Sequence, residues 1–169
     1  MMSGTVIKKM NMLVVDDDRS ILKFFKIHLG NTFSSVVVVS TKKEGVKLIT
    51  TYPIDLIITD YDLPQSDGYS LMKAVKKYDH TIPVACISGM PFVKSDEEDI
   101  LTEFDGFLSK PFDIDELGEL IDNMVRIRKH NLAGLCEVVS LKDHPLTQAK
   151  RQKVAQLKTT HPAKIRKSS

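Results

Sequence analysis

The sequence predicts an α/β fold in which a doubly wound sheet of five parallel strands is covered by helices on both faces. From residue 10 to about residue 130, short β-branched runs alternate with stretches of helical periodicity. This alternation is the pattern of a buried parallel sheet. The chain has 169 residues, 42% of them hydrophobic, which is enough for one core and a short extension.

The expected strands are the apolar runs at residues 11–16, 35–39, 56–60, 84–88 and 106–109. Five helices are expected between and after these strands, each with apolar residues at helical spacing or an acidic start. The first has Ile21, Leu22, Phe25 and Leu29 on one face, with Asp18 or Ser20 as cap, and the second, which starts at Thr41, has Val46 and Ile49. The third has Leu71, Met72 and Val75 after the turn pair Asp67-Gly68, the fourth is the acidic segment 95–104, and the fifth has Ile114, Leu117, Leu120, Ile121 and Met124. Arg126, Arg128 and Lys129 suit the negative end of the last helix. The result is a (βα)5 order.

The distribution of charge divides the chain near residue 130. Residues 1–125 contain 13 Lys and Arg against 20 Asp and Glu, whereas residues 126–169 contain 11 against 2. The sequence therefore predicts one domain at residues 10–130 and a short basic C-terminal extension at residues 131–169, partly helical or disordered. The absence of a long apolar stretch and of a signal-peptide core predicts a cytoplasmic protein without a membrane span.

Acidic residues follow two of the predicted strands at the point where the backbone must turn. Asp16, Asp17 and Asp18 come after the run 12–15, and Asp60 ends the run 56–60. If these strands are parallel neighbours, the carboxylates converge at the carboxyl edge of the sheet, where open α/β sheets bind ligands. Such a cluster repels itself unless a divalent cation or a proton neutralises it.

Three further motifs lie at the ends of later strands. They are Ser88-Gly89, Lys110-Pro111, and the segment 60–68, which has the pattern Asp-x-x-Leu-Pro-x-x-Asp-Gly. Together with the acid pair and in this order, they resemble the receiver domain of bacterial two-component response regulators over residues 10–130. The resemblance implies a flavodoxin-like arrangement. It also implies a phosphoacceptor switch, with Mg²⁺-dependent self-phosphorylation and slow autodephosphorylation as its only chemistry.

The resemblance assigns Asp60 as the phosphoacceptor, a carboxylate nucleophile. It places Mg²⁺ on Asp17, with Asp16 and the backbone carbonyl of Asp62 as further ligands. Mg²⁺ prefers oxygen sites of this kind, with few carboxylates and several retained waters.

The same resemblance places Lys110 and the hydroxyl of Ser88 against phosphoryl oxygens. It makes Ser88 and Phe107 the switch residues that move between two states, with the output formed by the fourth helix, fifth strand and fifth helix. It also implies that the Lys110-Pro111 bond is commonly cis. A phenylalanine at position 107 preserves the packing change but lacks a hydroxyl group.

The implied partners are a sensor histidine kinase or histidine phosphotransfer protein and a downstream protein target, with a homodimer as a further option. Two alternatives stay open. The basic extension could bind nucleic acid, although it has about 39 residues and no aromatic stacking residues. The sequence Asp60-Tyr61-Asp62 also fits a haloacid-dehalogenase-type phosphatase, although that family has its Asp-x-Asp on the first strand.

Overall fold

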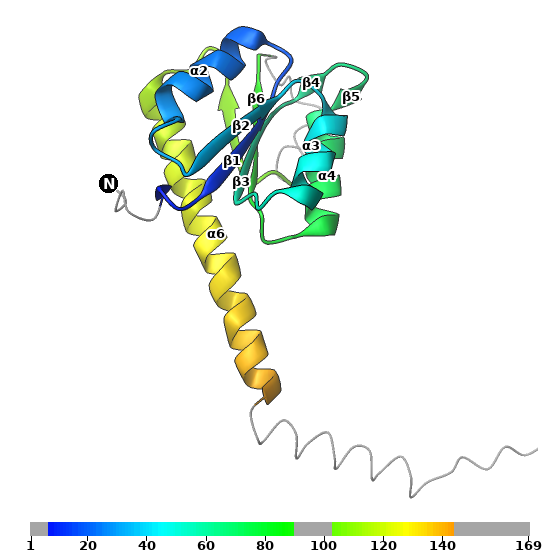
Figure 1. The fold of residues 1–169 in the computed structure, drawn as a ribbon, viewed down its shortest axis with the longest axis vertical. Helices are drawn as coiled ribbons and strands as arrows, with labels where there is room; N and C mark the ends of the chain where they lie inside the picture. Colours follow the sequence, from blue (N-terminus) through cyan, green and yellow to red (C-terminus); the bar gives the residue numbers. More distant parts are fainter. Residues whose placement is uncertain (1–6, 90–102, 144–169) are drawn as a thin grey trace, which may run out of the picture. The chain divides into compact units, whose positions relative to one another are not determined.

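The structure is a computed structural model that describes residues 7–89 and 103–143. Five parallel strands form one sheet in the order β2-β1-β3-β6-β7 (Figure 1). The strands are β1 (Asn11–Val15), β2 (Ser35–Val39), β3 (Leu56–Asp60), β6 (Val84–Ser88) and β7 (Gly106–Ser109). This confirms the predicted sheet, except that β1 ends one residue earlier than expected.

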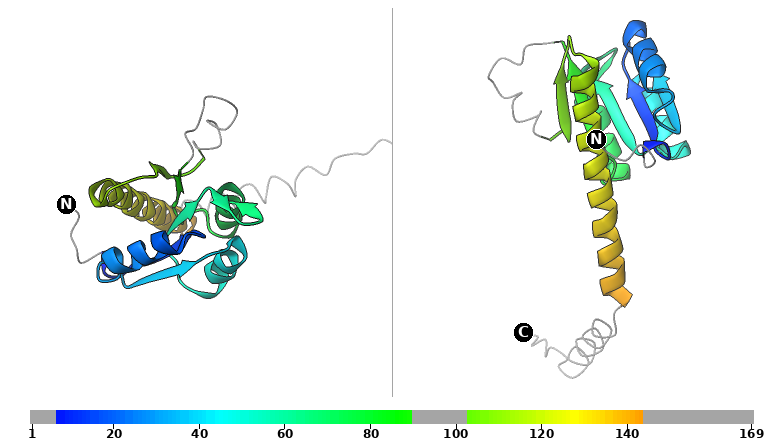
Figure 2. Two further views of the ribbon diagram at one scale, coloured as in Figure 1. Left: turned by 90° about the horizontal axis from the view of Figure 1, so that it is seen from above. Right: turned by 90° about the vertical axis from the view of Figure 1, so that its left-hand side faces the viewer.

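In the described part of the chain, four helices cover the two faces of the sheet, the last of them through its residues before 130 (Figures 1 and 2). They are α2 (Arg19–Leu29), α3 (Lys42–Thr51), α4 (Gly68–Tyr78) and α6 (Ile114–Asp143). Alternate residues of the buried strands point to opposite faces. Met12 and Val14 therefore pack with α2 and α6, whereas Leu13 and Val15 pack with α3 and α4. The expected fourth helix, at residues 95–104, falls almost entirely outside the described residues.

The register of the central strands brings the acids together. Val15 of β1 pairs with Thr59 of β3, so the next residues, Asp16 and Asp60, lie side by side where the two strands end. Ile87 of β6 pairs with Asp60 on its other side. The carboxyl edge of the sheet thus has the acidic residues at its centre.

The segment after β3, for which the sequence predicts only a turn, forms a small antiparallel hairpin. It contains β4 (Asp62–Leu63) and β5 (Ser66–Asp67). Gln65 lies in its turn with φ of 60°, a conformation that non-glycine residues rarely adopt. Asp67 caps α4, because its carboxylate accepts a hydrogen bond from the backbone N–H of Ser70 at 2.5 Å.

At the opposite edge of the sheet, Arg128 is buried within α6, which continues to Asp143. It therefore does not lie at the negative end of the helix, the position that the sequence suggested. Only 8% of Arg128 is exposed. Its guanidinium donates a hydrogen bond to Thr81 Oγ1 and lies 3.5 Å from Asp55 and 3.6 Å from Asp79. Burial would raise the pKa of the Asp79 carboxyl, but the hydrogen bonds from Thr81, together with Arg128, outweigh burial and lower that pKa. Arg128 thus ties α6 to the start of β3 and to the loop before β6.

The last helix is longer than the sequence predicted. Five apolar positions and a basic end suggested that it stops near residue 129, but α6 continues to Asp143. The segment after His130 contains no proline before Pro145, and the single Gly134 is tolerated in a helix. The chain divides into two units, Met1–His130 and Asn131–Ser169, and the second is described only for its helical residues up to 143.

No helix within residues 7–89 and 103–143 combines the length and the apolar character needed to cross a bilayer.

Candidate functional site

The centre of the site is an ammonium group held between two carboxylates. The Nζ atom of Lys110 lies 2.8 Å from Asp16 Oδ2 and 3.0 Å from Asp60 Oδ2, and it donates a hydrogen bond to each. The two acids are shielded from solvent, because the exposed fraction of Asp16 is 1% and that of Asp60 is 9%. Three residues far apart in the sequence therefore form one compact ionic cluster.

A third carboxylate, Asp17, completes an acidic group that could hold a metal ion. One oxygen from each of Asp16, Asp17 and Asp60 can be chosen so that all three lie within 4.8 Å of one another. Asp17 is exposed, and Asp16 Oδ1 accepts a hydrogen bond from the backbone N–H of Asp18 at 2.8 Å. A set of hard oxygen donors that is open to solvent on one side fits Mg²⁺, which keeps several waters when it binds proteins.

Burial and the hydrogen bonds of Lys110 shift the pKa values of Asp60 and Lys110 in the cluster. Burial raises the pKa of Asp60, the neighbouring Asp16 charge adds to this, and the hydrogen bond from Lys110 only partly opposes it. Burial would lower the pKa of Lys110, but its hydrogen bonds to Asp16 and Asp60 outweigh that effect and the pKa is raised. Lys110 therefore stays cationic and provides the only neutralising side chain for this acid pair within the described residues.

Ser88 lies at the end of β6, one residue beyond the partner of Asp60. Its side chain is buried, and its carbonyl oxygen accepts a hydrogen bond from the backbone N–H of Lys110 at 2.7 Å. The Lys110-Pro111 peptide bond is cis, as the resemblance implied. The structure thus brings Ser88, Lys110 and Asp60 to one edge of the sheet.

The other two predicted site residues lie at the margin of this cluster. Phe107, on β7, is 36% exposed, and it pairs with Cys86 in the sheet. Burial, reinforced by the charges of Asp60 and Asp62, raises the pKa of the Cys86 thiol to about 12, so that thiol is inert. The side chain of Asp62 is exposed in β4, and the role assigned to its backbone carbonyl stays a prediction.

Gly68 has a packing role that the sequence alone does not predict. A Cβ atom at this position would lie 2.3 Å from the carbonyl oxygen of Asp60, far inside van der Waals contact. The backbone N–H of Gly68 also donates a hydrogen bond to the carbonyl oxygen of Tyr61 at 2.8 Å. Gly68 therefore lets the start of α4 pack directly against the backbone of Asp60. The Asp-Gly pair in the sequence was the available signal, but it indicated only a turn.

A groove of about 570 Å³ lies beside the cluster and shares Lys110 with it. Its other lining residues come from α2 and from the segment after Lys110, namely Ser20, Ile21, Phe24, Pro111 and Phe112. The rings of Phe24 and Phe112 pack edge to face with centroids 5.9 Å apart. The groove is thus mainly apolar and leads to the acidic cluster.

The fold and the cluster define a class of protein: a parallel α/β domain with buried acids and a lysine at the carboxyl edge of its sheet. The family model of the response regulator receiver domain matches residues 12–122. The chain belongs to this family, which confirms the resemblance found from its motifs.

Similar curated proteins are response regulators and a probable transcriptional regulator. The chain is 30% identical over 116 residues to the probable transcriptional regulator ycf27 of Cyanidium caldarium. The aligned residues cover 69% of this chain and 46% of that protein. This chain is 28% identical over 120 residues to the cell cycle response regulator CtrA of Brucella ovis, covering 71% and 52%. The chain spans about half the length of the curated relatives it matches.

Solved structures with the same fold include receiver domains. The receiver domain of the Francisella response regulator 1452 is 33% identical, with a TM-score of 0.59, covering 72% of this chain and 98% of that one. An adenylate cyclase from Rhodopirellula baltica has a TM-score of 0.68 at 21% identity, covering 80% and 99%. At that identity the second likeness shows the fold alone.

Proposed function

We propose that this chain is a phosphorylation-controlled switch in which Asp60 accepts a phosphoryl group from a phosphohistidine and protein contacts change as a result. The observation that supports this best is the position of the Lys110 ammonium, 2.8 Å from Asp16 and 3.0 Å from Asp60 at the edge of the sheet. A cation placed there can neutralise a transferred group and the acids around it. The resemblance of the motifs and the family of the chain agree with this role.

The metal of the proposed reaction is Mg²⁺, held by Asp17 and Asp16 and by the backbone carbonyl of Asp62. When bound, Mg²⁺ would neutralise phosphoryl oxygens that must approach several carboxylates. The support for this assignment is the set of oxygen donors from Asp16, Asp17 and Asp60 within 4.8 Å of one another.

In the proposed transfer, a carboxylate oxygen of Asp60 attacks phosphorus and forms an acyl phosphate. The bond between phosphorus and the donor imidazole breaks, and the imidazole keeps the electron pair. Lys110 would pair with one phosphoryl oxygen, and the hydroxyl of Ser88 would donate a hydrogen bond to another. Transfer of this kind depends mainly on positioning and charge neutralisation, which these side chains can supply.

The phosphohistidine donor, a sensor kinase or a histidine phosphotransfer protein, would bind in the apolar groove formed by Ile21, Phe24 and Phe112. The groove shares Lys110 with the acidic cluster, so a protein bound there could bring an imidazole to Asp60. Ser88 and Phe107 would then change position and alter the surface that a downstream protein contacts. A cytoplasmic location stays a prediction.

Labelling with acetyl phosphate and Mg²⁺, followed by intact-protein mass spectrometry, tests the proposal. We expect one phosphoryl group per chain in the wild type, none in Asp60→Asn, and a reduced amount in Lys110→Ala. Asp62→Asn is the matched control, since it changes an exposed acid two residues away and keeps the backbone carbonyl. Equal labelling of the wild type and Asp60→Asn would overturn the assignment.

The phosphatase alternative is separated by incubation with a phosphomonoester. Sustained release of phosphate favours a phosphatase, whereas a stoichiometric acyl phosphate favours the switch. The nucleic-acid alternative rests on the basic extension, most of which lies outside the described residues. The salt-dependent DNA binding of the full chain is compared with that of a chain lacking residues 144–169, and unchanged binding after the deletion would exclude this alternative.

A further inference from the structure

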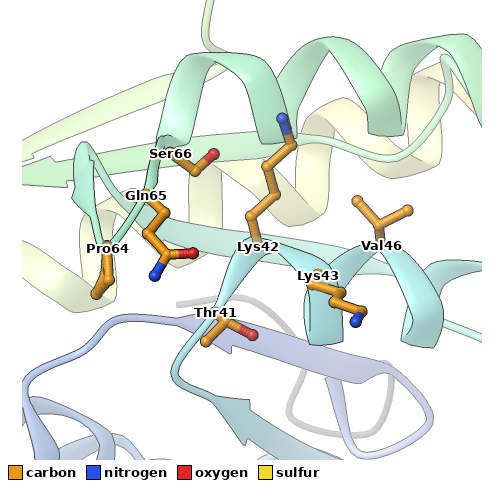
Figure 3. A pocket seen from close by; sticks show the side chains of 7 residues that line it. All are labelled: Thr41, Lys42, Lys43, Val46, Pro64, Gln65 and Ser66. Carbon is orange, nitrogen blue, oxygen red and sulfur yellow. The ribbon is translucent and has the colours of Figure 1, made fainter.

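A second pocket lies next to the hairpin that follows Asp60, on the side of α3 (Figure 3). Its volume is about 500 Å³, and it is lined by Thr41, Lys42, Lys43, Val46, Pro64, Gln65 and Ser66. Val46, Pro64 and the aliphatic stems of the lysines give it apolar walls, while hydroxyl, amide and ammonium groups give it polar ones. The pocket thus has the mixture of surfaces that a partner side chain with an apolar body and a polar tip requires.

Lys42 is the unusual member of this pocket. Four basic side chains among the described residues are half-buried or buried: Lys42, Lys76, Lys110 and Arg128. The last three each lie within ion-pair distance of a carboxylate. Within the part of the chain that the structure describes, Lys42 forms no ion pair, and its ammonium donates a hydrogen bond to the neutral Ser70 hydroxyl at 2.7 Å. An ammonium whose partner is a neutral hydroxyl gains a stronger, charge-assisted hydrogen bond when a carboxylate reaches it.

The position of the Lys42 ammonium is fixed by a chain of hydroxyl groups. Ser70 Oγ donates a hydrogen bond to the carbonyl oxygen of Asp67 at 2.9 Å, and it lies 3.1 Å from Ser66 Oγ. Figure 3 shows the Lys42 side chain extending from the start of α3 toward α4, between Ser66 and Val46. Because the charge is held in place before a partner arrives, binding would lose little side-chain entropy.

The nearby acids do not cancel the positive charge of the pocket. Thr41 caps α3, and the Glu44 carboxylate in the first turn of that helix accepts a hydrogen bond from Thr41 Oγ1 at 2.9 Å. The Asp67 carboxylate caps α4 by accepting a hydrogen bond from the backbone N–H of Ser70. Both acids lie at the positive end of a helix, and neither forms an ion pair with Lys42 or Lys43 among the described residues. A carboxylate that enters the pocket would therefore meet two ammonium groups that no acid of the described residues already pairs with.

We propose that this pocket binds an acidic side chain, Glu or Asp, flanked by apolar residues on a protein partner. The carboxylate would pair with the Lys42 ammonium, and the apolar neighbours would pack on Val46 and Pro64. An extended acidic and apolar segment fits better than a free anion, because a carboxylate alone would leave the apolar walls in contact with water. The proposal does not require phosphorylation of Asp60, so it can fail or succeed separately from the function proposed above.

The test uses the full chain labelled with ¹⁵N and titrated with an acetylated and amidated hexapeptide of alternating Leu and Glu. We expect the largest shifts at the backbone amides of Thr41, Lys42, Lys43, Gln65 and Ser66. Lys42→Gln should weaken binding about tenfold, the effect of one charge-assisted hydrogen bond. Lys47→Gln, an exposed lysine on the same helix outside the pocket, should leave the affinity unchanged.

Two controls change the charge of the pocket and the charge of the peptide. Gln65→Glu adds a negative charge at the exposed rim of the pocket, where it would repel the acidic peptide or pair with Lys42 in its place. It should therefore also weaken binding, so a folding defect in Lys42→Gln would not decide the test. The same peptide with Gln in place of Glu should bind more weakly. Three results would each overturn the proposal. They are an equal loss of peptide affinity in Lys42→Gln and Lys47→Gln, an affinity of the Gln peptide equal to that of the Glu peptide, and chemical-shift changes with inorganic phosphate alone that equal those with the peptide.

Discussion

Replacing Gly68 with alanine should disturb the protein in a way that follows directly from one short contact. The new Cβ would lie 2.3 Å from the carbonyl oxygen of Asp60, 3.1 Å from its carbonyl carbon and 3.1 Å from Cγ2 of Thr59. Backbone atoms cannot rotate away as a flexible side chain can. Either the start of α4 or the backbone of Asp60 must therefore move by about 1 Å to restore van der Waals contact.

We expect Gly68→Ala to lower the free energy of unfolding by about 1–3 kcal/mol, the usual cost of overpacking. For a domain of this size the melting temperature should fall by about 3 °C or more per kcal/mol. Labelling by acetyl phosphate should also slow, because the backbone that moves is that of the proposed phosphoacceptor. Urea denaturation and the rate of labelling measure the two effects.

Gly118→Ala is the matched control for this prediction. Gly118 lies exposed on α6, and a Cβ there would meet no atom within 4 Å. Because alanine reduces the conformational entropy of the unfolded chain, Gly118→Ala should stabilise the protein by about 0.5–1 kcal/mol and leave labelling unchanged. If Gly68→Ala proved as stable and as readily labelled as Gly118→Ala, the assigned role of Gly68 would be wrong.

Three further predictions concern Arg128, Asp79 and Gln65. Arg128→Met should lower the free energy of unfolding, measured by urea denaturation, by about 2–4 kcal/mol, because it leaves the partly buried Asp55 and Asp79 without their cation. Arg126 is exposed, so Arg126→Met should change that free energy by less than about 0.5 kcal/mol. Because the pKa of Asp79 is lowered in the folded state, its contribution to stability is present above a pH of about 4 and lost as pH falls through the folded pKa. Asp79→Asn should therefore be less stable than the wild type at pH 7, and the difference should disappear in acid; a difference independent of pH would contradict this. Gln65→Gly should raise the melting temperature by relieving the positive φ, a gain of about 0.5–1 kcal/mol, and an unchanged or lower melting temperature would refute the strain.

Much of the sheet could be predicted because its strands are buried on both faces. Runs such as Leu56 to Thr59 are continuously apolar or β-branched, and no competing helical period disturbs them. The convergence of Asp16 and Asp60 followed from the parallel order alone, since parallel neighbours end at the same edge. The proximity of Lys110 could be expected only through the resemblance, because 50 residues separate it from Asp60.

Other features were missed because they depend on tertiary contacts. The burial of Arg128 depends on Asp55 and Asp79, which lie far away in the sequence and carry no pattern that points to α6. The close approach of Gly68 to Asp60 is a contact between a helix start and a strand end, and a sequence shows it only as a turn pair. The β4–β5 hairpin has only two residues in each strand, too few for any periodicity.

In the proposed function, Asp60 forms an acyl phosphate with the help of Mg²⁺. This step is tested most directly by incubating the protein with acetyl phosphate and Mg²⁺, reducing it with borohydride and mapping its peptides by mass spectrometry. Reduction converts an aspartyl phosphate to homoserine and so marks the modified residue. We predict homoserine at position 60 alone, and none when Mg²⁺ is chelated. Homoserine at another acid, or at position 60 regardless of Mg²⁺, would contradict the account.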